Sequence, residues 1–220
     1  QPPPGLDRDA IDKLWSPVES VLPALVDRLT DRRLTPGDTA MLYQYIAMAS
    51  VRHTSFAYVA QQWQAFHGGP PPIGDQIQLM RVQALANQVR VLANWRWRVL
   101  HAPEDGPRLM ITDRGWMYVG EPDRRDHALL LAMGPRVALL GYLDSADLPQ
   151  PKRAPFEEHL DLYMSWIEWF NAAASADPYI GALYSHPSDR ALVEDLPDPS
   201  KILVNEYGPY RYKVSSGLMD

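Results

Sequence analysis

The sequence predicts a single α+β domain: a helical N-terminal layer packed on a small, mostly antiparallel sheet, with a long C-terminal helix. Three observations predict it. Apolar residues recur every three or four positions across residues 7–92, as they do in amphipathic helices. Across residues 94–143 they alternate with polar residues or form short runs, as in strands, and the helical spacing returns across residues 155–176. Because helices and strands are segregated along the chain, α+β architecture is favoured over alternating βαβ units.

The N-terminus is expected to contain an arm and one long helix. Residues 1–6 are rich in proline and predict a disordered arm. Residues 7–33 have the apolar spacing of an amphipathic helix. Pro17 and Pro23 should kink or divide that helix, since each proline removes a backbone donor.

Two further helices are expected before the first strand. Thr35-Pro36-Gly37-Asp38 is typical of a helix start, with Thr35 as the N-cap and the proline in the first position. The helix that follows is expected to continue toward Phe66, where the glycines and prolines of residues 68–72 end it. The third helical pattern covers residues 73–92.

Short strands are expected in the middle of the chain, over residues 95–99, 109–112, 116–119, 128–133 and 137–143. In the first of them, Trp95-Arg96-Trp97-Arg98-Val99, apolar and charged residues alternate. That alternation indicates a strand with one buried and one wet face. Two apolar runs separated by Gly134-Pro135-Arg136 predict a pair of neighbouring strands.

The domain is expected to span residues 7–186 and to be followed by an irregular tail. A long helix is predicted over residues 155–176, with one more helical turn over residues 180–184. The tail, residues 187–220, is rich in Pro, Asp and Tyr, and its one strand candidate is residues 201–204. We expect this tail to pack on the domain or on a partner.

Composition narrows the classes of function. The net charge of −6 argues against nucleic-acid binding over a broad surface, which needs a basic face. The chain has no cysteine, which excludes disulfides, thiolate catalysis and zinc sites with cysteine ligands. There is no apolar run long enough to predict a transmembrane helix. We therefore expect a cytoplasmic protein that does not bind membranes.

The polar cluster Thr112-Asp113-Arg114 follows the apolar strand at residues 109–111 and is the first candidate site. Asp113 has the chemistry of a general base, a metal ligand or a hydrogen-bond anchor for substrate. Arg114 has that of a bidentate partner for a phosphate or carboxylate. The alternative is a turn at the strand end, in which Asp113 accepts backbone donors and Arg114 is solvated.

Two helical positions are further candidates. Arg52-His53-Thr54 is expected within the second helix or at a break in it, where so many polar residues are unusual if the helix is central, and His53 can titrate near neutral pH. The alternative is that Arg52 pairs with a carboxylate and Thr54 bonds back to the helix.

Asn171 lies in an aromatic-rich helix, where a buried amide needs partners; it would orient a loop such as 112–116 or contact a ligand. The alternative is a polar residue at the boundary of an aromatic core.

Other familiar chemistry is not expected. The histidines at positions 53, 67, 101, 127, 159 and 186 are scattered, so a metal site would require tertiary assembly, and we predict none. There is no phosphate-binding glycine loop, and no serine stands in a nucleophile elbow. The sequence implies no particular cofactor.

Seven short motifs follow one another between residues 10 and 186: Leu34-Thr35-Pro36-Gly37-Asp38, Arg52-His53-Thr54, Trp97, Ile111-Thr112-Asp113-Arg114, Ala132-Met133-Gly134-Pro135, Asn171 and Tyr184-Ser185. Their order resembles that of an uncharacterised, mainly bacterial family known as domain of unknown function 4238. Gly115-Trp116 stand where that family usually has Pro-Val. The family has no settled activity, so the resemblance implies no substrate.

The resemblance favours one site with three catalytic and five substrate-binding side chains: Asp113, Arg52 and Asn171, and Arg114, Thr54, Thr112, His53 and Ser185. The family also carries a His-His-x-x-Pro segment upstream of its first helix, which this sequence lacks. We expect that processing or loss removed the segment, which would leave the site incomplete.

Two hypotheses about function follow. The first is an enzyme-like domain, of hydrolase or phosphodiesterase type, acting on a phosphorylated or anionic small molecule or a nucleic-acid end. The second is a non-catalytic binding or structural subunit. Its partner surface, for another protein or a second copy, would be the arm of residues 1–6 and the tail with Tyr207, Tyr210 and Tyr212, since tyrosine is favoured at interfaces.

Overall fold

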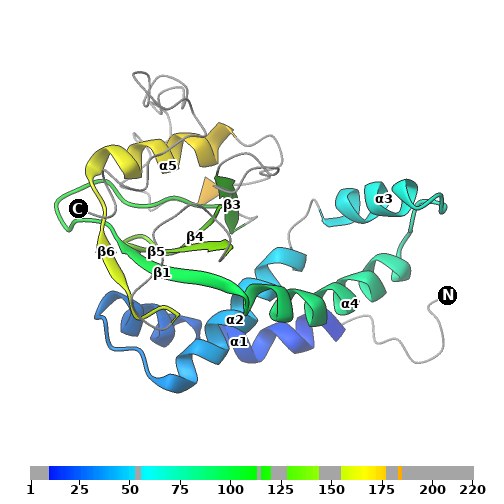
Figure 1. Ribbon diagram of the computed structural model, residues 1–220, viewed down its shortest axis with the longest axis horizontal. Helices are drawn as coiled ribbons and strands as arrows, with labels where there is room; N and C mark the ends of the chain where they lie inside the picture. The colour runs from blue at the N-terminus through cyan, green and yellow to red at the C-terminus, as the bar shows by residue number, and fades with distance from the viewer. Residues whose placement is uncertain are drawn as a thin grey trace.

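The computed structural model describes residues 10–52, 56–112, 115–119, 128–143, 155–176 and 183–184, and their fold is α+β, as predicted (Figure 1). The helices are α1 (Ala10–Thr30), α2 (Pro36–Arg52), α3 (Phe56–Phe66), α4 (Asp75–Leu92) and α5 (Met164–Ala176). The strands are β1 (Trp95–His101), β2 (Ile111–Thr112), β3 (Trp116–Val119), β4 (Ala128–Gly134), β5 (Val137–Leu143), β6 (His159–Asp161) and β7 (Leu183–Tyr184). The predicted arm, residues 1–6, and tail, residues 187–220, lie outside the described residues.

Five strands form the main sheet, in the order β3-β4-β5-β1-β6. All neighbours are antiparallel except β1 and β6, which run parallel. The sheet is therefore mostly antiparallel, as the sequence predicts. The two short strands β2 and β7 pair with each other in a separate ribbon, where Ile111 is opposite Tyr184.

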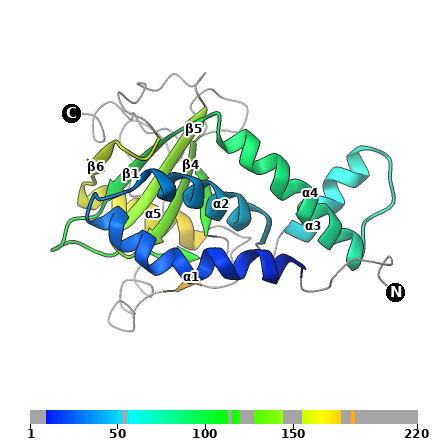
Figure 2. The same cartoon turned by 90° about the horizontal axis from the view of Figure 1, so that it is seen from below.

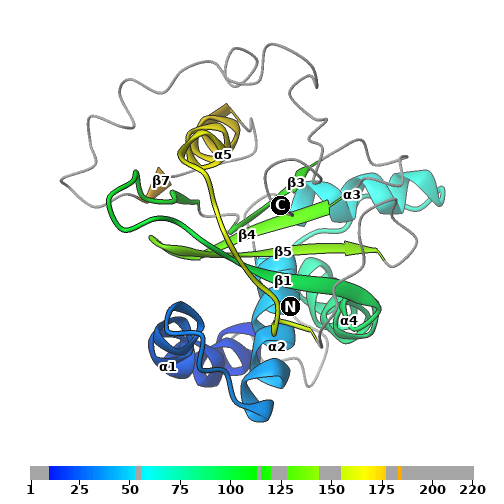
Figure 3. The same ribbon diagram turned by 60° about the vertical axis from the view of Figure 1, so that its left-hand side comes forward.

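Helices cover both faces of the sheet. Figure 3 shows α1, α2 and α4 on one side and α5 on the other. The larger core lies on the side of the three helices and includes Trp15, Leu25, Leu42, Ile46, Trp97, Leu131 and Leu139. The core on the α5 side includes Leu100, Leu130, Leu140, Tyr142, Ile167 and Trp169. Successive side chains of a strand point to opposite faces, so Val99 belongs to the first core and Leu100 to the second.

Two expectations about the helices are corrected. Of the two effects expected of the prolines, a kink or a division of the first helix, division is wrong: α1 is one element that contains Pro17 and Pro23. Both prolines are exposed, as are Lys13 and Glu19 four residues before them, so the carbonyls that lose a partner lie on the solvent side. The second helix does not continue to Phe66, because α2 ends at Arg52 and a separate helix, α3, begins at Phe56. Arg52, the first residue of the polar segment, is the last residue of α2, and His53 and Thr54 lie outside the described residues.

The predicted wet face of the first strand is also corrected. Arg96 is exposed, but Arg98 is only 1% exposed although the alternation places both on the same side. Its Nε donates to the Glu158 carboxylate at 2.9 Å, and its guanidinium lies over the Tyr142 ring, 5.4 Å from the centroid. Because this face of the sheet packs against α5, a charged residue on it is buried and held by partners.

The C-terminal region differs from expectation in two places. The predicted helix over residues 155–176 begins only at Met164, because the preceding residues pair with the open edge of β1 as strand β6. Backbone hydrogen bonds from Val99 to Glu158 (2.9 Å) and from Leu162 to His101 (2.7 Å) fix that pairing. The helical turn expected at residues 180–184 is wrong for Leu183 and Tyr184, which form β7 because β2 supplies backbone partners.

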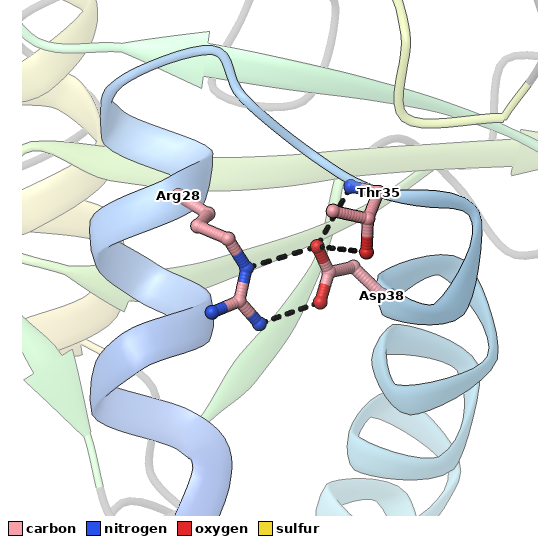
Figure 4. A network of polar contacts seen from close by, with 3 residues as sticks. All are labelled: Arg28, Thr35 and Asp38. Carbon is pink, nitrogen blue, oxygen red and sulfur yellow. Dashed lines mark hydrogen bonds and ion pairs between the residues drawn. The ribbon is translucent and has the colours of Figure 1, made fainter.

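The corner between α1 and α2 is held by the predicted helix start (Figure 4). The Asp38 carboxylate accepts from Arg28 Nε (3.0 Å) and Nη2 (2.6 Å), and from the backbone N–H (2.7 Å) and hydroxyl (2.9 Å) of Thr35. Thr35 directly precedes α2, at the N-cap position predicted for it, and its hydroxyl donates to this carboxylate. The Arg28 guanidinium, followed by the Thr35 donors, lowers the pKa of Asp38 to about 2 against the cost of burial.

Asp38→Asn is expected to lower the free energy of unfolding by about 1–2 kcal/mol. Because the pKa of Asp38 is lowered by folding, its contribution is complete above the unfolded value of 3.8 and is lost as pH falls toward about 2. The fall in stability between those pH values should therefore be smaller in the variant. Urea unfolding at a series of pH values measures this, and Asp27→Asn, at an exposed position of α1, should leave the fall unchanged.

Candidate functional site

Arg52, one of the predicted catalytic residues, is the last residue of α2 and lies at the surface. Its Nη1 donates to the carboxylate of Glu19 on α1, and its guanidinium lies over the Trp15 ring, 4.6 Å from the centroid. Of the two interpretations that the sequence left open, the structure shows the pairing with a carboxylate. For Arg52 to hold an anionic ligand, the Glu19 ion pair would have to open.

Asn171 lies on α5 and is only 2% exposed. Its Oδ1 accepts the backbone N–H of Met110 at 2.8 Å, and its Nδ2 donates to the carbonyl of Arg108 at 2.7 Å. The buried amide therefore holds the segment that enters β2. The sequence predicted that Asn171 would orient a loop such as 112–116 or contact a ligand; the residues that it holds are 108–110.

The other predicted site residues, His53, Thr54, Asp113, Arg114 and Ser185, lie outside the described residues, as does the side chain of Thr112. Residues close to Asp113 and Arg114 are described. A Cβ built at Gly115 would lie 3.9 Å from Ala49 Cβ on α2, one helical turn before Arg52. Met110, on the other side, is held by Asn171 on α5. Arg52 and Asn171 themselves come from helices on opposite faces of the sheet (Figure 3).

A pocket of about 680 Å³ lies at the β6 edge of the sheet, opposite the loop between α1 and α2. It is lined by Arg32, Leu34, Phe156, Glu157, Glu158, His159 and Leu160. Two of its charged groups are engaged in ion pairs, Arg32 with Asp161 and Glu158 with Arg98. The pocket thus carries charges of both signs and is not selective for an anion.

Beside this pocket two histidines form a pair that sequence reasoning missed. His101 Nε2 and His159 Nδ1 are 2.7 Å apart, and the rings stack with centroids 5.0 Å apart. At that distance one ring donates an N–H to the lone pair of the other, so at least one is neutral. No local signal links residues 58 positions apart; only the parallel pairing of β1 with β6 brings them together.

Because of His101, the free energy of unfolding is expected to decrease by about 1–2 kcal/mol as the pH falls from 6.5 toward 4. Burial, followed by the Arg32 charge and His159, lowers the pKa of His101 to about 4. A histidine pKa lowered by folding stabilises the protein above the unfolded value and loses that contribution as pH falls. Denaturant unfolding of His101→Asn should show a smaller fall over this range than unfolding of the wild type. Equal falls in the two proteins would contradict the assignment.

Among the described residues, no group of three or more His, Asp or Glu side chains is placed to hold a metal ion. None of the helices that the structure describes combines the length and apolar character needed to cross a bilayer.

A second surface of interest is the α3–α4 hairpin, which extends away from the sheet (Figure 2). Phe56 and Ala60 anchor α3 in a small core with Ile77 and Met80 of α4. Beyond this anchor, Phe66 is 86% exposed, Ile73 73% and Trp63 57%. We call Trp63, Phe66, His67 and Ile73 the hairpin end.

The hairpin end is held in place by local structure. α3 ends in a Schellman motif, in which the Gly69 N–H donates to the Gln64 carbonyl (3.0 Å) and the Gly68 N–H donates to the Ala65 carbonyl (2.9 Å). Gly68 has φ +72°, which glycine adopts without strain. The His67 ring packs edge-on against Trp63 and Phe66, with centroids 4.4 and 5.3 Å apart. The aromatic rings are therefore displayed on an ordered helix end.

No protein-family model, curated protein or solved structure matches this chain. Membership in the family that its motifs resemble stays a prediction.

Proposed function

We propose that this chain is a non-catalytic binding or structural subunit that contacts its partner through the hairpin end. The observation that carries the proposal is the exposure of three large apolar side chains: Trp63 and Phe66, which both pack on the His67 ring, and Ile73, in the segment that leads from α3 to α4. Ordered aromatic residues at an exposed position are typical of interaction surfaces, because their burial supplies much of the binding free energy. The sequence placed the partner surface on the tail and the N-terminal arm, so the hairpin end is an additional surface.

The contact can be tested before the partner is identified. A photoreactive benzoylphenylalanine replaces Phe66 in one version of the chain and Tyr163, which is also exposed, in another. After irradiation in the producing cells, we expect a discrete adduct from position 66, identified by mass spectrometry, and none from position 163. The proposal is wrong if position 66 gives no adduct, or if both positions give the same products.

We also propose, as the second candidate, the enzyme-like function with Asp113 as its central carboxylate. It is supported by the neighbours of the cluster at residues 112–114: on one side the buried Asn171 accepts the Met110 N–H, and on the other Gly115 lies near Ala49 of α2. A carboxylate beside an arginine suits a phosphorylated or anionic small molecule or a nucleic-acid end, and hydrolysis of a phosphodiester is the reaction type favoured.

Thermal unfolding with inorganic phosphate and a panel of nucleotides tests this second candidate. A ligand that binds the folded chain raises the midpoint temperature, and Asp113→Asn should alter that rise, as should Arg114→Gln. Hydrolysis of bis(p-nitrophenyl) phosphate by the wild type and not by Asp113→Asn would support catalysis. No shift and no hydrolysis would remove this candidate and leave the binding function standing.

A further inference from the structure

We infer that the partner of the hairpin end is a second copy of this chain, so that two hairpins pack together in a two-fold symmetric dimer. The inference rests on the proposed function, because it names the partner of the same surface. In a two-fold interface each chain offers the same patch to the other. The patch must therefore be complementary to itself.

The charge pattern of residues 53–74 meets this requirement. Residues 53–74 contain no Asp, Glu, Lys or Arg, although the whole chain has 27 acidic and 21 basic residues. A patch of one charge sign repels its own copy, whereas an uncharged patch does not. A partner with a strongly charged surface would find no opposite charge to pair with here. The absence of charge thus favours an identical, uncharged patch as the occupant.

The polar groups of α3 are also self-complementary. The helix carries Gln61, Gln62 and Gln64, of which Gln62 is exposed. A glutamine amide is both a donor and an acceptor, so it can form hydrogen bonds with the same residue of a second copy. Aromatic and apolar side chains at the centre, with neutral amides beside them, reproduce the usual apolar core and polar rim of an interface.

The exposed area is sufficient for a weak dimer. From the exposed fractions of Trp63, Phe66 and Ile73, the hairpin end offers roughly 400 Å² of apolar side-chain surface per chain. Two copies would bury on the order of 800 Å², and about 1,000 Å² with neighbouring residues such as Gln62, which is the low end for specific interfaces. The dimer should therefore be reversible and depend on protein concentration.

A lipid surface is the main alternative occupant. Peripheral membrane proteins commonly combine exposed aromatic residues with lysine or arginine, which are attracted to anionic headgroups. Residues 53–74 contain no such basic residue, and the chain as a whole is acidic. The observations therefore favour a second copy, and binding to vesicles serves as a contrary outcome in the test.

The first measurement is the molar mass by sedimentation equilibrium, at concentrations from about 1 to 200 µM. We expect the mass to rise from the 24.9 kDa of one chain toward twice that value. The double variant Trp63→Gln, Phe66→Gln should remain at 24.9 kDa throughout, with its helical circular dichroism retained, since glutamine is a good helix former. Tyr163→Gln, Met164→Gln, which removes two exposed side chains at the start of α5, should behave as the wild type.

Charge complementation then distinguishes a second copy from any other partner. Gln62→Lys and Gln62→Glu each place two like charges in a homodimer. Each variant alone should therefore raise the dissociation constant of the dimer at least tenfold. An equimolar mixture pairs opposite charges and should recover dimer at physiological salt. Such recovery is expected only if the hairpins face each other.

The inference is overturned if the wild type is monomeric at the highest concentration, or if both double variants dimerise equally. Co-sedimentation of the monomeric chain with phosphatidylcholine vesicles, lost in the hairpin double variant, would assign the surface to lipid instead. A monomer that still gives an identified adduct with a different protein from position 66 would end the inference and leave the proposed function intact.

Discussion

Gly141→Ala is expected to lower the free energy of unfolding by about 2–4 kcal/mol, one of the two largest effects predicted for this protein. Gly141 of β5 lies opposite Trp97 of β1. A Cβ built at Gly141 would lie 2.5 Å from Trp97 Cζ3 and 2.6 Å from Cη2, well inside van der Waals contact. The indole therefore occupies the space that any side chain at this position needs.

The indole ring cannot easily move away. Trp97 is fully buried, and its ring is stacked with Trp95 and Phe156, with centroids 6.1 and 5.5 Å away. Its Nε1 donates to the carbonyl of Leu92 at 3.1 Å, so a shift would break a buried hydrogen bond. Strain in such a close-packed core is relieved only by displacing several neighbours.

Urea unfolding measures the effect, with Gly37→Ala as the matched control. A Cβ at Gly37 would meet only Thr35 Oγ1, at 3.9 Å, and the residue lies in the first turn of α2, so alanine should be neutral or slightly stabilising. Trp97→Phe combined with Gly141→Ala should cost less than the sum of the single changes, because the smaller ring leaves room. A Gly141→Ala variant as stable as the wild type would show that the ring can shift.

Asn171→Leu is expected to lower the free energy of unfolding by about 2–4 kcal/mol. Leucine has a similar shape and neither donates nor accepts, so Met110 N–H and Arg108 C=O both lose their amide partner. Met110 is buried, so its N–H has no ready access to water. The loss should be concentrated in the segment that enters β2, and hydrogen exchange at residues 108–112 should accelerate more than exchange in β4 and β5.

Two variants on the same helix separate these contributions. Asn171→Asp keeps an acceptor for Met110 N–H but places a carboxylate against the Arg108 carbonyl. Glu168→Leu changes an exposed position of α5 and should stay within about 0.5 kcal/mol of the wild type. If Asn171→Leu is as stable as the wild type, water must satisfy both backbone groups, and the structural importance of this amide would be disproved.

Local sequence signals predicted several element boundaries. The start of α2 at Pro36 and the end of α3 at Phe66 both lie where a capping residue or a glycine acts within one helical turn. The paired strands β4 and β5 lie where two apolar runs flank Gly134-Pro135-Arg136. These boundaries depend on backbone conformations and on contacts between residues a few positions apart, so they can be predicted from the sequence alone.

The candidate site was predictable only in part. A buried amide among aromatic residues needs polar partners, and the sequence suggested a loop such as 112–116 for Asn171, whereas the amide holds residues 108–110. The pairing of Arg52 with a carboxylate was one of two alternatives, and nothing in the sequence selected Glu19, which is 33 positions away. The sequence also did not single out the hairpin end, because exposure of Trp63 and Phe66 depends on what the rest of the chain leaves uncovered.

By itself, the sequence determined the α+β class, the order of helices before strands, and the uncharged segment at residues 53–74. The tertiary structure alone decided that residues 159–161 become a strand, that Arg98 is buried, and that His101 meets His159. Periodicity and capping reflect interactions within one or two turns of chain. Strand addition and the burial of a charge instead depend on the free energy of contacts between distant segments, which exist only once the sheet and its covering helices have assembled.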